Sequence, residues 1–220
     1  MTKTKLAHVH MENLSYRSVF QKQMQLHNKL KNQPNSKVHT LITCTHLPVF
    51  TLGKNADQQN IYTSPEKLNE LGFEIVQTNR GGDVTYHGPG QLVVYPILNL
   101  NQLKMGAKKY VHLIEICTIK CLHNFGIGSE TNSINPGVWI KNPWRKIAAI
   151  GIKISQGVTL HGLSLNVNTN LEHYRYINPC GLNDFDVTSM QKEIQAPIDE
   201  REIRSEFIRI FSKEFGYETI

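Results

Sequence analysis

Residues 80–91 read Arg80-Gly81-Gly82-Asp83-Val84-Thr85-Tyr86-His87-Gly88-Pro89-Gly90-Gln91, and this glycine-rich segment lies between two expected strands. Glycine permits positive φ and lets backbone N–H groups approach a ligand closely, so such a segment can cradle an anion or a polarised carbonyl. The segment matches neither G-x-x-x-x-G-K-S/T nor G-x-G-x-x-G, the two common phosphate-binding patterns. The residues alone also fit a long connection that needs glycine for its turns.

Strands and helices are expected on both sides of this segment. Short apolar or alternating runs predict strands at 38–44, 48–52, 73–78 and 91–98. Apolar residues at helical spacing predict amphipathic helices at 15–31, 110–125 and 199–215. The chain shows no internal repeat or linker, and with 220 residues that are 40% hydrophobic it can bury one substantial core. We therefore predict a single α/β domain, of the α+β type, over residues 1–220.

Two further strand-like runs, 145–155 and 158–168, are joined by Gln156-Gly157, which is typical of a two-residue hairpin turn. In this register the numbers of opposing residues sum to 313. The middle of the hairpin then pairs Ala149, Ile150 and Gly151 with Ser164, Leu163 and Gly162. A patch of small residues is therefore expected there.

Lys146 lies near the start of this hairpin, on the same face of its strand as Ala148, Ile150, Ile152 and Ile154. A lysine in such an apolar row has two interpretations. Either it lies at the rim of the sheet with its amine in water, or it is partly desolvated and gives up its proton more easily. The residues alone leave both open.

Cys180 lies between Pro179 and Gly181 in a polar stretch, which predicts an accessible turn. Cys117 and Cys121 fall instead on the apolar stripe of an expected helix. Cys180 is therefore the candidate nucleophile, although an inert cysteine in a turn fits the same residues. The four cysteines form no C-x-x-C pair, so we expect neither a disulfide framework nor a metal site.

Charge and hydropathy narrow the class of partner. Lys and Arg number 24 against 18 Asp and Glu, and the resulting net charge of +6 favours an acidic partner. The basic residues are scattered rather than clustered with aromatic residues, so we expect no nucleic-acid partner. No run approaches the roughly 18 to 20 apolar residues that span a bilayer, and the N-terminus lacks the apolar centre of a secretory signal. A cytoplasmic protein without membrane contact is expected.

Several motifs, in order along nearly the whole chain, give the sequence a close resemblance to the lipoyl(octanoyl) transferase family. They are Pro48-Val49-Phe50-Thr51-Leu52-Gly53-Lys54, the segment Arg80 to Gln91, Gly137-Val138-Trp139, Lys146 to Gly151, His161 to Val167, and Pro179-Cys180-Gly181. The resemblance implies the biotin/lipoate ligase catalytic fold, a mixed β-sheet flanked by helices. Lipoate and biotin ligases share that fold, but they usually lack the P-C-G cysteine and need ATP.

The resemblance also implies a role for each matching residue. Cys180 corresponds to the acyl-thioester nucleophile of the family, and Lys146 to the lysine that activates it and acts as acid and base. The substrate-binding residues correspond to Arg80, Gly81, Gly82, Asp83, Val84, Thr85, Tyr86, His87, Ala149, Ile150, Gly151, Gly162, Leu163 and Ser164. Asp83 adds an acid at a variable position and Ser164 replaces a common alanine, so both alter the polarity expected of the pocket.

The implied reaction moves an octanoyl group from octanoyl-acyl carrier protein to a lipoyl-domain lysine, the first step of protein lipoylation. Because a thioester is already activated, a cysteine thiolate can accept the acyl group without ATP or another cofactor. The implied acceptors are the lipoyl domains of 2-oxoacid dehydrogenase complexes and the glycine cleavage H protein. Two alternatives stay open: an ATP-dependent lipoate or octanoate ligase, in which Lys146 holds an acyl-adenylate, and a non-catalytic module that binds an acidic carrier.

Overall fold

The predicted hairpin is formed by two long strands, β9 (Arg145–Ser155) and β10 (Val158–Asn166). The computed structural model describes residues 4–132, 135–178 and 186–218. Gln156 and Gly157 have φ of 50° and 78°, as the favoured type I′ turn requires. Gly151 lies opposite Gly162 and Ala149 opposite Ser164, so the predicted hairpin register is confirmed.

The hairpin belongs to a large mixed sheet with the order β1-β2-β6-β10-β9-β8-β7. The other strands are β1 (Lys5–Leu14), β2 (Val38–His46), β6 (Gln91–Ile97), β7 (Glu130–Thr131) and β8 (Gly137–Ile140). β1 pairs in parallel with β2, whereas the remaining neighbours in this order are antiparallel. A short strand, β11 (Asp186–Val187), pairs in parallel with the first two residues of β9.

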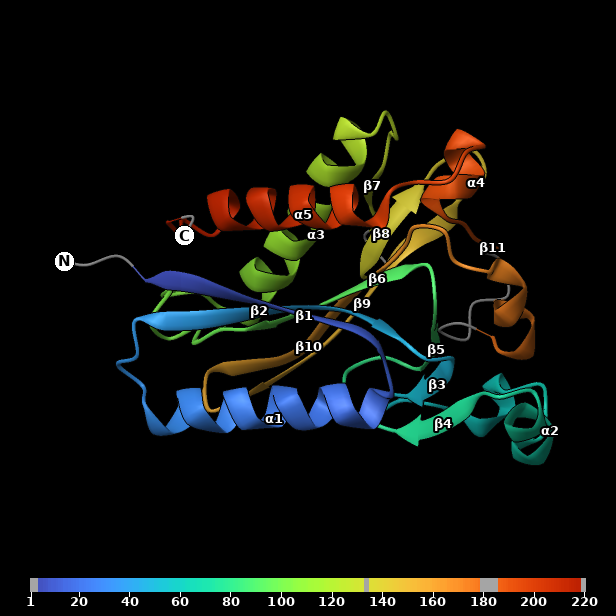
Figure 1. Cartoon of the computed structure of the whole chain (residues 1–220), viewed down its shortest axis with the longest axis horizontal. Coiled ribbons are helices and arrows are strands. Elements are labelled where there is room, and N and C mark those ends of the chain that lie inside the picture. The colour runs from blue at the N-terminus through green and yellow to red at the C-terminus, as the bar shows by residue number, and fades with distance from the viewer. Residues whose placement is uncertain (1–3, 133–134, 179–185, 219–220) are drawn as a thin grey trace.

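Helices cover both faces of this sheet (Figure 1). α1 (Tyr16–Asn32) lies along one face, and α3 (Ala107–Asn124) and α5 (Glu200–Glu214) lie along the other. The alternation of each strand supplies both interfaces: Val93 packs in the apolar cluster that contains α1 residues, and Val94 in the cluster that contains α3 and α5 residues. Side chains of Ser15 and Asp199 accept hydrogen bonds from the first turns of α1 and α5, which fixes where these helices begin.

A second sheet of three strands, β4-β3-β5, lies beside the N-terminal end of α1 (Figure 1). Its strands are β3 (Val49–Leu52), β4 (Glu74–Gln77) and β5 (Val84–His87). Four short helical turns complete the described chain: η1 (Gln58–Asn60), α2 (Pro65–Glu70), η2 (Leu171–Tyr176) and α4 (Met190–Ile194). The small sheet contains part of the glycine-rich segment, because Val84–His87 of that segment forms β5.

The structure corrects the sequence interpretation at two strands. Residues 80–91 are not one loop, because Val84–His87 pairs with β3 as strand β5. Residues 5–14, which carry no apolar alternation strong enough to indicate a strand, form the edge strand β1. Its polar side chains find partners across the sheet: His8 Nε2 lies 2.8 Å from the Thr43 hydroxyl. An edge strand needs only one buried face, so its pattern is weak.

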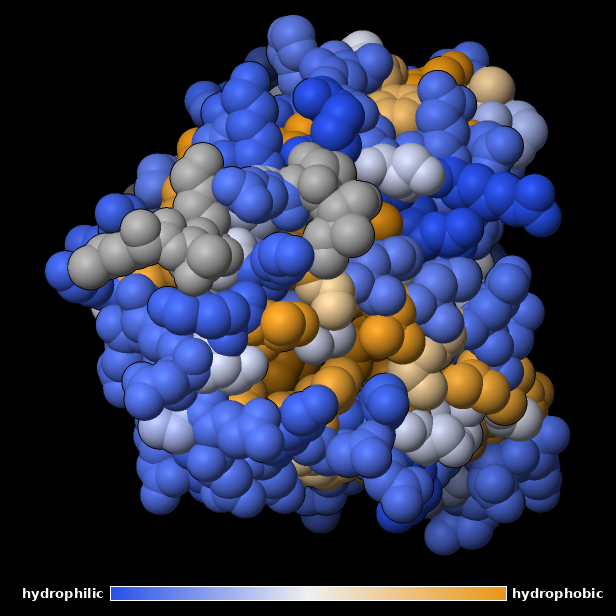
Figure 2. Space-filling model, turned by 60° about the vertical axis from the view of Figure 1, so that its left-hand side comes forward, coloured by the Kyte–Doolittle hydropathy of each residue, from blue (hydrophilic) through white to orange (hydrophobic). Residues whose placement is uncertain are grey.

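Figure 2 shows one face on which hydrophobic residues gather around a hollow near the centre, with hydrophilic side chains around it. Among the described residues, no helix is long and apolar enough to cross a bilayer.

Candidate active site

The glycine-rich segment folds over the edge of β9. β8 pairs with β9 only as far as Ala149, so the edge of β9 is open beyond that residue. Gly81 crosses it there, and its N–H donates to the Ile152 carbonyl at 2.9 Å. On its other side the segment packs on Gly53, where a Cβ would lie 2.1 Å from the Gly82 carbonyl oxygen. Backbone this close leaves no room for a side chain at Gly53, and at Gly151 of β9 a Cβ would lie 2.9 Å from the Gly81 carbonyl oxygen.

A cavity of about 490 Å³ lies between this segment and the β9–β10 hairpin. This volume lies within the range typical of small-molecule sites, roughly 300 to 1,000 Å³. Fourteen of the residues assigned to the site from the sequence line it: Arg80, Gly81, Gly82, Asp83, Val84, Thr85, His87, Lys146, Ala149, Ile150, Gly151, Gly162, Leu163 and Ser164. The structure therefore brings together residues up to 84 positions apart in the chain.

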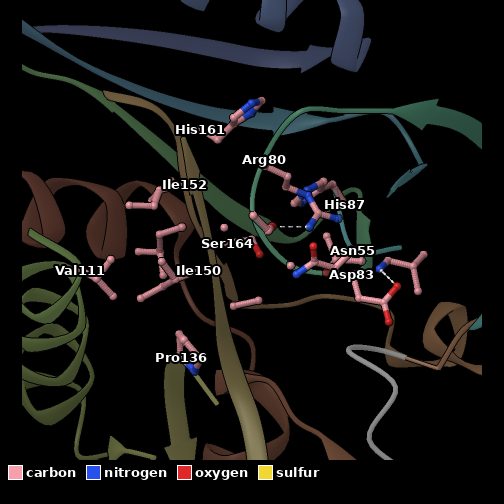
Figure 3. A pocket seen from close by; sticks show the side chains of 18 of the residues that line it. Asn55, Arg80, Asp83, His87, Val111, Pro136, Ile150, Ile152, His161 and Ser164 are labelled. Carbon is pink, nitrogen blue, oxygen red and sulfur yellow. Dashed lines mark hydrogen bonds between the residues drawn. The ribbon is translucent and has the colours of Figure 1, made fainter. Parts of the chain in front are cut away.

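The cavity has an apolar side and a polar side (Figure 3). Val111 of α3 lies near Ile150 and Ile152 of β9 on one side. Side chains of the glycine-rich segment, among them Arg80 and His87, lie on the other, together with Asn55. Such a cavity can hold an apolar chain and, at the same time, direct hydrogen bonds at a polar head.

Lys146 lies where β9 is paired on both sides, with Trp139 of β8 and Val187 of β11. Its side chain is only 8% exposed, so its amine does not stand in open water at the rim of the sheet. The Nζ atom lies 4.6 Å from the centre of the Trp139 ring, a position where the π face attracts a cation. Gly137, on the neighbouring strand, approaches β9 closely, because a Cβ there would lie 2.5 Å from the Ala148 carbonyl oxygen. The lysine is thus buried at one end of the cavity.

Arg80 and Asp83 hold the glycine-rich segment in place. The Arg80 guanidinium donates to the Thr51 hydroxyl through Nε at 3.1 Å and to the Gly81 carbonyl through Nη1 at 3.0 Å. The Asp83 carboxylate accepts from the Val84 N–H at 2.7 Å and from the Asn60 amide. These charge-assisted bonds are stronger than bonds between neutral groups, so they keep the cavity wall in one conformation.

Buried histidines and tyrosines close the cavity at the end away from Lys146. His87 Nδ1 bonds Gln91 Oε1 at 2.8 Å, and the Gln91 amide nitrogen donates to Asn166 at 2.9 Å, so His87 carries its hydrogen on Nδ1. Burial, with the nearby His46 and Arg80, holds the pKa of His87 well below its usual range. Burial, with Arg80, lowers the pKa of His161 to about 3. Both rings are therefore neutral at pH 7.

Four other residues at this end of the cavity are not recognisable as site residues from the sequence. Tyr16, Tyr95 and His161 line the cavity, and His46 lies behind it with its Nε2 2.9 Å from the Tyr95 hydroxyl. These residues come from α1, β2, β6 and β10, so no local motif connects them. The fact that His161 belongs to one of the quoted motifs is the single signal that the sequence offered.

Of the described residues that were assigned from the sequence, Tyr86 alone does not line the cavity. The Tyr86 side chain points into the apolar cluster around Phe50 and Phe73, and its hydroxyl lies 2.8 Å from His173 Nδ1. Its contribution is to the packing of the small sheet. Cys180 lies outside the described residues. The chain on either side of residues 179–185 is placed, however: the Asn178 N–H donates to the Asn60 carbonyl at 2.7 Å, and Val187 pairs with Lys146.

Comparison with known proteins identifies the family. Residues 15–212 match the family described as the lipoyl protein ligase A/B catalytic domain. An octanoyltransferase of Alkaliphilus metalliredigens is 41% identical over 216 residues, which are 97% of this chain and 98% of that protein. The chain belongs to the octanoyltransferase family. The resemblance inferred from the motifs is thereby confirmed for the family and for an enzymatic function in protein lipoylation.

Comparison with solved structures identifies the fold of this octanoyltransferase. A bipartite lipoate protein ligase from Thermoplasma acidophilum superposes with a TM-score of 0.73 at 14% identity, covering 100% of this chain and 86% of that one. A biotin protein ligase from Aquifex aeolicus gives 0.56 at 14% identity, covering 96% and 70%. At such low identity these likenesses concern the fold alone. They confirm the predicted biotin/lipoate ligase catalytic fold with a mixed sheet and flanking helices.

Proposed function

We propose that this octanoyltransferase takes an octanoyl group from octanoyl-acyl carrier protein and passes it to a lipoyl-domain lysine through a thioester on Cys180. The observation that carries the proposal is the cavity itself, which joins the buried amine of Lys146 to an apolar wall of Val111, Ile150 and Ile152. An eight-carbon chain gains about 0.8 kcal/mol for each methylene that leaves water, so such a wall favours an acyl substrate.

The placement of the chain around residues 179–185 supports Cys180 as the nucleophile. On the upstream side, Asn178 is bonded to Asn60, whose amide donates to the Asp83 carboxylate in the cavity wall. On the downstream side, Asp186 and Val187 pair with Arg145 and Lys146. The segment that contains Cys180 is therefore tied at both ends to residues of the same site.

The other three cysteines are poor candidates for the nucleophile. Cys44, Cys117 and Cys121 are free thiols with no exposed surface. Burial raises the pKa of Cys121 to about 12 and that of Cys117 and Cys44 further, so none is a thiolate at neutral pH. A nucleophile needs the thiolate form. By elimination, Cys180 is the cysteine left for the chemistry.

The reaction proceeds in two acyl transfers. In the first, the Cys180 thiolate attacks the thioester carbonyl; a new C–S bond forms, the C–S bond to the carrier breaks, and the carrier thiolate takes up a proton. In the second, the acceptor lysine amine attacks the acyl group on Cys180, a C–N bond forms and the C–S bond to Cys180 breaks. One amine proton ends on a departing sulfur or in water, and we assign its transfer to the Lys146 amine. The exchange of thioesters needs no ATP, and formation of an amide makes the second step favourable.

Lys146 has two tasks in this scheme. As an ammonium held over Trp139, it stabilises a thiolate at Cys180 by charge, because burial reduces the screening that water would provide. As a neutral amine, it accepts the proton of the attacking lysine. The net charge of +6 supports acidic protein domains as donor and acceptor, since opposite charges accelerate association.

The experiment that tests the proposal is the intact mass of the purified protein after mixing with octanoyl-acyl carrier protein in the absence of ATP. We expect the mass to rise by one octanoyl group, fragmentation to place the group on Cys180, and a lipoyl domain to remove it. Cys180→Ala should show no adduct, whereas Cys117→Ala, the matched control in a buried cysteine, should keep it.

Two outcomes would contradict the proposal. Transfer by a folded Cys180→Ala protein would exclude the covalent intermediate. Acylation of the lipoyl domain only when ATP and free octanoate are supplied would identify the protein as a ligase instead.

A further inference from the structure

Tyr16 lies between the candidate cavity and a second hollow, beside the contacts that His161 makes with Phe20 and Asn79. Tyr16, the first residue of α1, lines the cavity and also a hollow of about 580 Å³ between α1 and β4. The second hollow is lined by apolar side chains, among them Phe20, Met24 and Val76, and by polar residues such as Arg17 and Gln77. Tyr16 is itself 2% exposed and packs with Val49 and Val76. Its ring is therefore a partition between two spaces rather than a surface group.

This partition lies at the end of the cavity away from Lys146. Ile152 follows Lys146 by six residues in β9, which corresponds to roughly 20 Å of strand. His161 faces Ile152 across the hairpin, and the Tyr16 hydroxyl lies 3.2 Å from His161 Nδ1. In Figure 3, His161 and Pro136 lie at opposite ends of the group of side chains that line the cavity.

Hydrogen bonds and stacking hold the partition in one position. His161 Nε2 lies 2.7 Å from Asn79 Oδ1, so Nε2 carries the hydrogen and Nδ1 accepts that of the Tyr16 hydroxyl. The His161 ring stacks on Phe20 with 5.5 Å between centroids, and its backbone N–H donates to Gln23 Oε1 at 3.0 Å. His161 has a φ of 59°, a left-handed conformation that costs energy in a residue with a side chain. Tyr16 therefore cannot swing aside without breaking several contacts.

We propose that Tyr16 sets the upper limit on acyl-chain length, because its side chain ends the acyl cavity and keeps it separate from the hollow between α1 and β4. The inference rests on the proposed function, since it places the acyl chain in the cavity with its methyl end toward Tyr16. Chains longer than octanoyl need the space beyond the tyrosine. If that space were open, each further buried methylene would strengthen binding about fourfold.

The test is a competition between acyl chains. Wild type and variants are mixed with equal amounts of octanoyl-, decanoyl-, dodecanoyl- and tetradecanoyl-acyl carrier protein, and the thioester adducts are counted by intact mass. We expect Tyr16→Ala to raise the ratio of dodecanoyl to octanoyl adduct by at least about tenfold. Tyr16→Phe keeps the ring and should leave the ratio at the wild-type value. Met24→Ala enlarges only the second hollow and should also leave the ratio unchanged.

Folded Tyr16→Ala protein with the wild-type ratio would overturn the inference. If the alanine variant does not fold, Tyr16→Leu, which retains an apolar side chain but is shorter, should raise the ratio by about threefold or more, and an unchanged ratio would count against the inference equally.

A binding measurement keeps this inference distinguishable from the proposed function. This measurement uses Cys180→Ala protein and free fatty acids, so that no acyl transfer is needed. In this protein, octanoate should raise Tm more than dodecanoate does. Adding Tyr16→Ala should reverse that order. If Cys180→Ala protein gives the same Tm shifts with and without Tyr16→Ala, the role of Tyr16 is overturned. If Tyr16→Ala reverses the order of the Tm shifts but the wild type forms no thioester adduct, the covalent mechanism alone is overturned.

Discussion

At the scale of single residues, the proposed role of Lys146 depends on its neighbours. The side chain is nearly buried, and its Nζ lies over the Trp139 ring, which attracts the ammonium without neutralising it. An aspartate in place of the ring would bind the lysine more tightly and would also repel a thiolate. The Trp139 ring attracts a cation and brings no negative charge of its own near the proposed thiolate.

Replacing Lys146 should slow the reactions of the Cys180 thiol more than any other reaction of the protein. We expect Lys146→Met to lower the rate of Cys180 alkylation by iodoacetamide at pH 7 by about tenfold. The pH at which that rate rises should also increase, because the thiolate loses a stabilising charge. Octanoyl transfer should fall by at least about 100-fold, the usual contribution of a positioned acid–base group. Lys153→Met, on the same strand but outside the cavity, is the control. An alkylation rate equal to that of the wild type would argue against any coupling between the two residues.

At the scale of secondary-structure elements, the contact between β10 and β6 depends on one glycine. Gly162 lies so close to β6 that a Cβ would stand 2.2 Å from the Val94 carbonyl oxygen and 2.8 Å from Pro96 Cδ. Neither atom belongs to a flexible side chain, so the two strands would have to separate. β10 also carries Ser164 and His161, which line the cavity, so a displacement of β10 would change the cavity wall.

Gly162→Ala should therefore destabilise the fold strongly. We expect the free energy of unfolding in urea to fall by about 3 kcal/mol, at the upper end of the usual cost of overpacking, because the clash is with backbone. Gly128→Ala, where a Cβ meets nothing within 4 Å, should change it by less than about 0.5 kcal/mol. Equal stability of the two variants would show that β10 can move away from β6 at little cost.

Elements also show how far sequence alone can predict this protein. The β9–β10 register followed from two residues, because a two-residue turn fixes which positions face each other. β1 was missed because a polar edge strand is defined by its partner rather than by its own pattern. The contact of Tyr16 with His161 could not be predicted, since it joins a helix start to a strand 145 residues later. The motif residues were recognisable singly, but only the fold shows that Tyr86 turns away from the cavity.

At the scale of the whole molecule, the two sheets and α1 meet around a buried polar centre. His46, His87 and His161 lie there within a group of aromatic rings that includes Tyr16 and Tyr95. The three imidazoles come from β2, β5 and β10, so their neutrality is a condition for packing the two sheets together. Protonation would place like charges beside one another and beside Arg80.

This arrangement predicts a loss of stability in mild acid. Burial lowers the pKa of His46 to about 4 and that of His161 to about 3, whereas both titrate near 6.5 in the unfolded chain. Below pH 6.5 the histidines are therefore protonated in the unfolded state but not in the folded state. Stability falls as the pH is lowered, until the folded-state pKa values are reached. Each histidine contributes about 2 kcal/mol of this loss between pH 7 and pH 5. Urea unfolding at the two pH values measures it.

A single substitution separates this cause from the general effect of acid on carboxylates. His46→Gln cannot be protonated, so its stability should fall between pH 7 and pH 5 by about 2 kcal/mol less than that of the wild type, whatever its stability at pH 7. His123→Gln, in an exposed histidine of α3, should keep the wild-type difference. If His46→Gln lost as much stability as the wild type over this range, the buried histidines would not be what makes the packing of the two sheets sensitive to acid.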